Sequence, residues 1–136
     1  MTGYLLDTNV LSEVLRKRPD TRLLERLRSA SALDLATSVV CVAELRYGAA
    51  RHPSGPRLWQ RIVREVLPRV RVLPLREGEA ARAGDLLARL EAKGEPIGIE
   101  DVLIAATALE GGLTVATRNL RHFSRVEGLA VESWWT

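Results

Sequence analysis

The sequence predicts an α/β fold in which a mainly parallel sheet of four to five strands is covered by helices on both faces. Short apolar runs alternate along the chain with longer segments that repeat their leucines at helical spacing. No two apolar runs are joined by the short turn of a hairpin, and this absence favours parallel strands with helical crossovers. The length of 136 residues and the hydrophobic content of 46% suit one domain over residues 1–136.

The first apolar run, GYLLD, ends in the polar triplet Asp-Thr-Asn. It predicts a buried strand that stops at Asp7, followed by a helix that Thr8 or Asn9 caps and that extends to Leu15. A proline and an aspartate at 19 and 20 then restart the chain. The second helix is predicted from leucines that share one face, at Leu23, Leu24 and Leu27.

The middle of the chain continues the alternation. A short strand near 34–37 precedes a helix that Ser38 caps and that runs to about Tyr47, with Gly48 as its stop. The Pro-Ser-Gly-Pro stretch at 53–56 predicts a loop before another helix. The alternating VRVL run at 70–73 predicts a third strand.

Two further strand and helix pairs complete the predicted fold. Residues 77–93 form an amphipathic helix that Gly94 ends, and a helix that is uncharged over 102–109 begins near Ile99. The fourth strand is TVAT at 114–117, and LAVES at 129–133 predicts a fifth. The chain then closes in two tryptophans, for which packing against the sheet or a second subunit is favoured over stacking on RNA bases.

Composition narrows the class of protein. The net charge is +3, and all 20 cationic side chains except Lys17 and Lys93 are arginine, which suits phosphate binding or simply solvated helix faces. No apolar run approaches the roughly 20 residues of a membrane span, and no signal peptide is apparent, so we expect a cytoplasmic protein. Because Cys41 is the single cysteine, an internal disulfide is excluded. Its place in an apolar run predicts a small buried side chain.

Three carboxylates end or interrupt apolar segments. Asp7 ends the first strand, Glu44 is the only charged residue over 35–45, and Asp101 begins the uncharged helix. Each alone is explained as a helix-end anion or a solvated edge residue. Together they predict a site, because the apolar segments that hold them must converge on one core and ligands bind at the carboxyl ends of parallel strands, where Asp7 lies.

Convergence of the carboxylates is electrostatically costly. Two like charges about 4 Å apart repel by about 4 kcal/mol at an effective dielectric of about 20, so the cluster requires protonation or a cation. Oxygen ligands without imidazole or thiolate select Mg²⁺ or Mn²⁺. Such a site suits hydrolysis of a phosphodiester.

Four segments of the chain stand out: YLLDTNVLSE (4–13), VCVAELRYG (40–48), IGIEDVLIAATAL (97–109) and TVATRNLRHF (114–123). In order and spacing they resemble the motifs of the PIN-domain ribonucleases, and within them the VapC-type toxins and their FitB-like branch. The resemblance covers nearly the whole chain. It implies a three-layer α/β/α fold and a Mg²⁺-dependent endoribonuclease, with Mn²⁺ as a substitute, in which metal-activated water cleaves RNA.

The resemblance also implies roles for individual residues. Asp7, Glu44 and Asp101 correspond to the acidic metal ligands and, with Asn119, to the catalytic set. Asn119 stands where many members have a fourth acid, and His122 stands where an Asp is frequent. Thr117 and Arg118, at the end of the fourth strand, correspond to substrate-binding positions. Arg121 and the basic run at 16–18 are further candidates for phosphate contacts.

The implied partners are an RNA substrate, a VapB-type antitoxin and a second copy of the chain, with operator DNA bound only through the antitoxin. An alternative hypothesis is a non-catalytic nucleic-acid-binding module that retains the fold but lost turnover through Asn119 and His122. A phosphatase with Asp7 as nucleophile is less favoured, because Thr8 and Asn9 follow where a second Asp is required.

Overall fold

The computed structural model describes residues 3–135 and contains a five-stranded sheet. The strands lie in the order β3-β2-β1-β4-β5, and each neighbouring pair is parallel. Their bounds are β1 (Tyr4–Leu6), β2 (Leu35–Ser38), β3 (Arg71–Leu73), β4 (Thr114–Ala116) and β5 (Val131–Glu132). Because the chain leaves the central strand β1 toward one side and returns on the other, the strand order reverses between β1 and β4, where ligands bind in such sheets.

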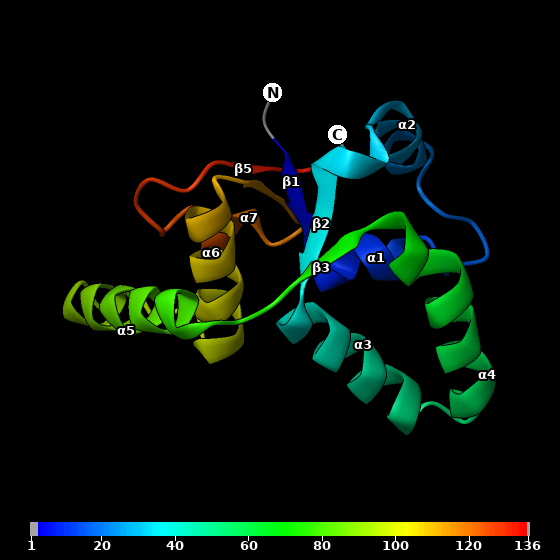
Figure 1. The fold of residues 1–136 in the computed structure, drawn as a ribbon, viewed down its shortest axis with the longest axis horizontal. Helices are drawn as coiled ribbons and strands as arrows, with labels where there is room; N and C mark the ends of the chain where they lie inside the picture. The colour runs from blue at the N-terminus through cyan, green and yellow to red at the C-terminus, as the bar shows by residue number, and fades with distance from the viewer. Residues whose placement is uncertain (1–2, 136) are drawn as a thin grey trace.

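Helices cover both faces of the sheet, as the sequence predicted. They are α1 (Thr8–Glu13), α2 (Thr21–Ser29), α3 (Val39–Arg51), α4 (Gly55–Arg61), α5 (Glu77–Ala92), α6 (Ile99–Gly111) and α7 (Leu120–Phe123). In Figure 1, α5 and α6 lie on one side of the strands, and α1, α2 and α4 lie on the other. Within residues 3–135, no helix is long and apolar enough to cross a membrane.

Two apolar cores result from the alternation of side chains along the strands. Leu5 and Val115 point to the face that α5 and α6 cover, whereas Leu6 and Ala116 point to the face that α1 and α2 cover. Trp134 lies in the second core, fully buried and edge-on to the ring of Tyr4 at 5.3 Å between centroids. The expectation that it packs against the sheet is therefore confirmed.

The first helix differs from the prediction at both ends. Its cap is Asp7 rather than Thr8 or Asn9, because the Asp7 carboxylate accepts from the Thr8 backbone N–H at 2.8 Å. Helix α1 ends at Glu13, two residues earlier than expected, and Leu15 continues only as a turn. A side chain that ends a strand thus also begins the following helix.

Helix α3 confirms Ser38 as its cap, since the Ser38 hydroxyl accepts from the Cys41 backbone N–H at 3.2 Å. It does not stop at Gly48 but continues to Arg51. Ala49 is 1% exposed in the second core, and this packing outweighs the roughly 1 kcal/mol that a glycine costs inside a helix. Gly94, in contrast, takes a φ of +68° immediately after α5 and ends that helix as predicted.

Candidate active site

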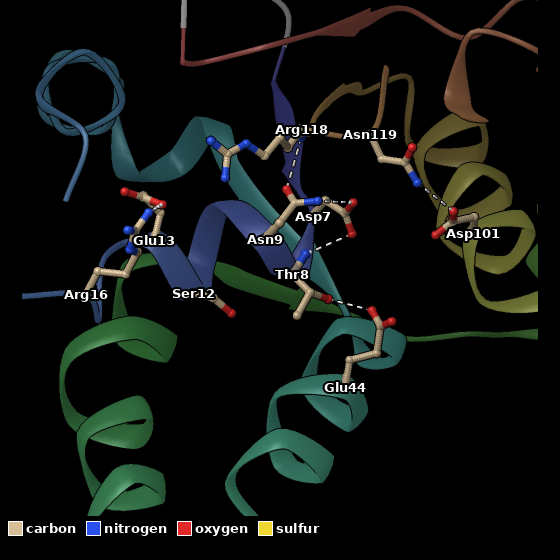
Figure 2. A pocket seen from close by; sticks show the side chains of 10 residues that line it. All are labelled: Asp7, Thr8, Asn9, Ser12, Glu13, Arg16, Glu44, Asp101, Arg118 and Asn119. Atoms are coloured by element: carbon tan, nitrogen blue, oxygen red, sulfur yellow. Dashed lines mark hydrogen bonds and ion pairs between the residues drawn. The ribbon is translucent and has the colours of Figure 1, made fainter. Parts of the chain in front are cut away.

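An open pocket of about 530 Å³ lies beside the carboxyl ends of β1 and β4 (Figure 2). Helices α1, α3 and α6 and the segment after β4 contribute its walls. It is lined by Asp7, Thr8, Asn9, Ser12, Glu13, Arg16, Glu44, Asp101, Arg118 and Asn119. The structure therefore brings together the three carboxylates that the sequence placed on separate elements, along with Arg118 and Asn119.

Asp7 is the most buried of the three predicted carboxylates, at 5% exposed. Its carboxylate accepts from the Thr8 backbone N–H and, at 2.8 Å, from the Thr117 hydroxyl. The pKa of Asp7 is raised to about 6, because burial and the nearby Asp101 and Glu44 charges together outweigh the lowering effect of these two hydrogen bonds. The fold thus holds this carboxylate in a place where its negative charge is unfavourable without a compensating cation.

Glu44 reaches the pocket from the second turn of α3. It is half-buried, and its Oε1 accepts from the Thr8 hydroxyl at 2.5 Å. The isolated charge in the apolar segment is explained by this position: one face of α3 packs into the cores through Cys41 and Leu45, and Glu44 lies at the edge that opens to the pocket.

Asp101 faces the pocket from the first turn of α6. Its Oδ2 accepts from the Asn119 side-chain amide at 3.3 Å and lies 3.0 Å from Nδ1 of His122. The Asn119 amide nitrogen also lies 3.0 Å from Nδ1 of His122, and this ring nitrogen either accepts from the amide or donates to Asp101, depending on the tautomer. In this arrangement the Asn119 amide orients Asp101 rather than offering its own oxygen to the pocket.

Thr117 and Asn9 both donate side-chain hydrogen bonds to Asp7. Thr117 is fully buried; its hydroxyl donates to Asp7 and accepts from the Asn119 backbone N–H at 2.9 Å. The Asn9 amide donates to Asp7 at 3.3 Å, and its oxygen accepts from the Arg118 backbone N–H at 3.1 Å. Thr117, predicted as a substrate-binding residue, does not line the pocket and contacts Asp7 instead.

Sequence reasoning missed the position of Cys41. Its sulfur is fully buried, as expected, but it also lies with donor oxygens of Asp7 and Glu44 in a group whose atoms are all within 4.8 Å of one another. Burial raises the pKa of the Cys41 thiol, which keeps it protonated and a poor metal ligand. The contact has no local signal, because Asp7 and Cys41 are brought together only by the pairing of β1 with β2.

The donors fit a hard divalent cation. Asp7 and Glu44 supply closely spaced oxygens, Asp101 borders the same pocket, and protonated Cys41 offers little competition. A cation there offsets the burial and the like-charge repulsion that raise the pKa of Asp7. The polar, open walls leave room for a substrate phosphate beside the carboxylates.

Comparison with known protein families matches residues 4–129 to the PIN domain. The chain belongs to the PIN-domain family. Among curated relatives, this PIN domain is 36% identical to Ribonuclease VapC2 of Haemophilus influenzae over 134 residues, which cover 98% of the chain and 99% of the relative. It therefore belongs to the VapC branch of the family.

Solved structures agree with this assignment. The PIN domain superposes on the FitAcB structure from Neisseria gonorrhoeae with a TM-score of 0.89 and 37% identity, covering 97% of this chain and 98% of that one. It superposes on the DNA-bound VapBC structure from Salmonella typhimurium with a TM-score of 0.88 and 32% identity, covering 98% and 99% of the two chains. The predicted family, the three-layer fold and the class of activity, a metal-dependent ribonuclease of the VapC type, are confirmed.

Proposed function

We propose that the chain forms one PIN domain over residues 1–136 and is the toxin of a type II toxin–antitoxin pair. In this proposal it cleaves RNA in the cytoplasm, with Mg²⁺ as cofactor and Mn²⁺ as a substitute. The observation that carries the proposal is the buried Asp7 carboxylate, whose pKa is raised to about 6 beside Glu44 and Asp101 in an open pocket. A site with this excess of negative charge binds a cation before it binds a phosphate.

Each proposed metal ligand has a structural support. Asp7 is held by Thr117 and the first turn of α1, Glu44 by the Thr8 hydroxyl, and Asp101 by Asn119. When bound, Mg²⁺ supplies polarisation of the phosphodiester and a nucleophilic water. Glu44, at the open edge of α3, is placed to orient that water, while Asn119 fixes the direction of Asp101.

Substrate RNA requires positive charge next to these acids. Arg118 is exposed on the pocket wall, and the +3 net charge of the chain favours association with a polyanion. Arg16 lines the same pocket, but its guanidinium lies 3.2 Å from the buried Glu13 carboxylate. We therefore assign the phosphate contact to Arg118, and Thr117 acts on the substrate by holding Asp7.

A VapB-type antitoxin is the proposed protein partner. An apolar groove of about 280 Å³ between α1, α3 and α4 shares Thr8, Ser12, Arg16 and Glu44 with the acidic pocket. A segment that fills this groove with apolar side chains can extend a basic side chain toward the carboxylates and take the place of the cation. We infer that operator DNA binds only through the antitoxin; among related toxins, the VapBC complex from Salmonella typhimurium was solved bound to DNA.

We propose a homodimer because apolar side chains are exposed at the outer edge of the sheet. Val39 and Val72 are 39% and 41% exposed, and the β2–β3 register pairs Thr37 with Val72, so both lie near the outer strand β3. Sedimentation velocity of the purified chain at micromolar concentration is expected to give the mass of a dimer. A monomer at every concentration, with and without RNA, contradicts this part of the proposal.

The nuclease is tested on total cellular RNA incubated with Mg²⁺, Mn²⁺ or EDTA. Discrete fragments with 5′-phosphate ends are expected with either cation and none with EDTA, because the carboxylates need the cation to bind and activate the scissile group. Expression without an antitoxin is expected to arrest growth.

Asp7→Asn, handled identically, is the control for contaminating nucleases. If the folded chain binds RNA in EDTA but cleaves nothing with any divalent cation, the proposal is wrong and the non-catalytic binding module replaces it.

A further inference from the structure

Arg118 differs from the other arginine of the pocket in having no acidic partner within residues 3–135. Among the described residues, no carboxylate lies within ion-pair distance of its guanidinium, whereas Arg16 is paired with Glu13. Figure 2 shows the Arg118 side chain extending along the pocket from the Asn119 side toward Glu13 and Arg16. Its N–H donors are therefore available to an anion that enters the pocket.

Trp135 is the side chain that contacts this guanidinium. The central guanidinium carbon of Arg118 lies 4.9 Å from the centroid of the Trp135 ring, within the range of a cation–π interaction. The aromatic ring attracts the cation but supplies no oxygen acceptor, so the contact restrains the arginine without neutralising it. An ion pair with a carboxylate, in contrast, occupies the N–H donors.

The position of Trp135 is itself determined by the core. It packs, half-buried, against the cluster that contains Leu6 and the fully buried Trp134. At the other end, the Arg118 backbone N–H donates to Asn9 on α1. The arginine is thus held at its backbone by the element that follows Asp7 and at its guanidinium by the C-terminal segment.

We propose that Trp135 is a positioning residue, which holds the Arg118 guanidinium at the pocket wall so that it binds a phosphate flanking the scissile position of single-stranded RNA. The inference deepens the proposed function and rests on its assignment of RNA as substrate. A long exposed arginine loses rotamer freedom when it binds, and prior restraint by the ring removes part of that cost.

The test is a double-mutant cycle on RNA binding. A short fluorescein-labelled single-stranded RNA is titrated in EDTA, where no cleavage occurs, with the wild type, Trp135→Leu, Arg118→Gln and the double variant. We expect Arg118→Gln to weaken binding about tenfold and to reduce the salt slope by about 0.7. Trp135→Leu is expected to weaken binding about threefold when Arg118 is present and not when it is absent.

A matched control exists elsewhere on the surface. The guanidinium of Arg46 lies 4.8 Å from the ring of Trp59 in a pocket that holds none of the three carboxylates. Trp59→Leu is expected to leave RNA binding unchanged. Trp135→Phe, which keeps an aromatic ring, is expected to restore most of the affinity that Trp135→Leu loses, and thermal melting checks that every variant is folded.

The positioning role is overturned if Trp135→Leu weakens binding equally with and without Arg118, or if Trp135→Phe binds no better than Trp135→Leu. Either result means that Trp135 acts through packing alone. Because binding is measured in EDTA, the outcome is independent of turnover. A chain that fails to cleave RNA with metal contradicts the proposed nuclease, whereas an additive cycle contradicts only the role of Trp135.

Discussion

Asp7→Asn is expected to lower RNA cleavage at least about a thousandfold and, in the absence of metal, to stabilise the folded chain at neutral pH. The two effects have one cause. Asp7 is 5% exposed beside two other carboxylates, so its charge is useful for binding a cation and costly when no cation is present. Asparagine keeps the shape of the side chain but removes the charge. The variant therefore loses cation binding, and it also loses the cost of burying a charge without a cation.

The pH dependence follows from the direction of the shift. The folded-state pKa of Asp7 is about 6, above the 3.8 of an ordinary aspartate, so between these values the folded chain binds more protons than the unfolded chain. The free energy of unfolding of the wild type therefore falls as pH rises through this window, by up to about 3 kcal/mol from this group. Asp7→Asn lacks that contribution.

Urea unfolding in EDTA at several pH values from about 4 to about 8 measures the difference between the two proteins. The free energy of unfolding of Asp7→Asn is expected to exceed that of the wild type increasingly as pH rises. Asp85→Asn is the matched control, since Asp85 is an exposed acid on α5, away from the pocket, and its loss is expected to leave the pH dependence unchanged. Parallel pH profiles for the wild type and Asp7→Asn contradict the assigned strain.

Millimolar Mg²⁺ or Mn²⁺ is expected to raise the melting temperature of the wild type. A cation that binds only the folded state adds about 1–3 kcal/mol when its concentration exceeds the dissociation constant by about ten- to a hundredfold, which corresponds to several degrees. The gain is expected to be larger at pH 7.5 than at pH 5, because protons compete with the cation for Asp7, whose pKa is about 6.

Differential scanning fluorimetry with potassium chloride at equal ionic strength separates specific binding from screening. Glu44→Gln and Asp101→Asn are each expected to reduce the gain, because each removes a proposed metal ligand. Asp101→Asn is also expected to raise the metal-free melting temperature, because it removes a charge that acts on Asp7. An unchanged melting temperature with both cations at pH 7.5 contradicts a metal site at these carboxylates.

The order and type of the elements were determined by the sequence itself. Apolar runs such as 114–117, helical leucine spacing in α2 and the Ser38 cap are local properties, and each strand they predicted is present. One error lies where packing overrode local preference: Gly48 does not end α3, because the buried Ala49 keeps the helix intact. The same local motifs were sufficient to indicate the PIN family, since their order and spacing are properties of the chain alone.

The three predicted carboxylates were indicated partly by the sequence and partly by the tertiary structure. That Asp7, Glu44 and Asp101 are unusual was visible from the apolar segments that hold them, and that they line one pocket was inferred from the rule for parallel sheets. How buried each one is could not be inferred. Asp7 is enclosed by Thr117, more than a hundred residues away, because β1 pairs with β4 in the centre of the sheet.

Only the tertiary structure decided which side chains support the site. His122 lies against Asp101, Cys41 beside Asp7, and Trp135 on Arg118, and each pair is joined across different elements. Periodicity reports only the face on which a residue lies, whereas a contact between distant residues depends on strand order and helix packing together. The sequence therefore indicated the candidate carboxylates and the family, and the fold decided how deeply each carboxylate is buried and what holds it.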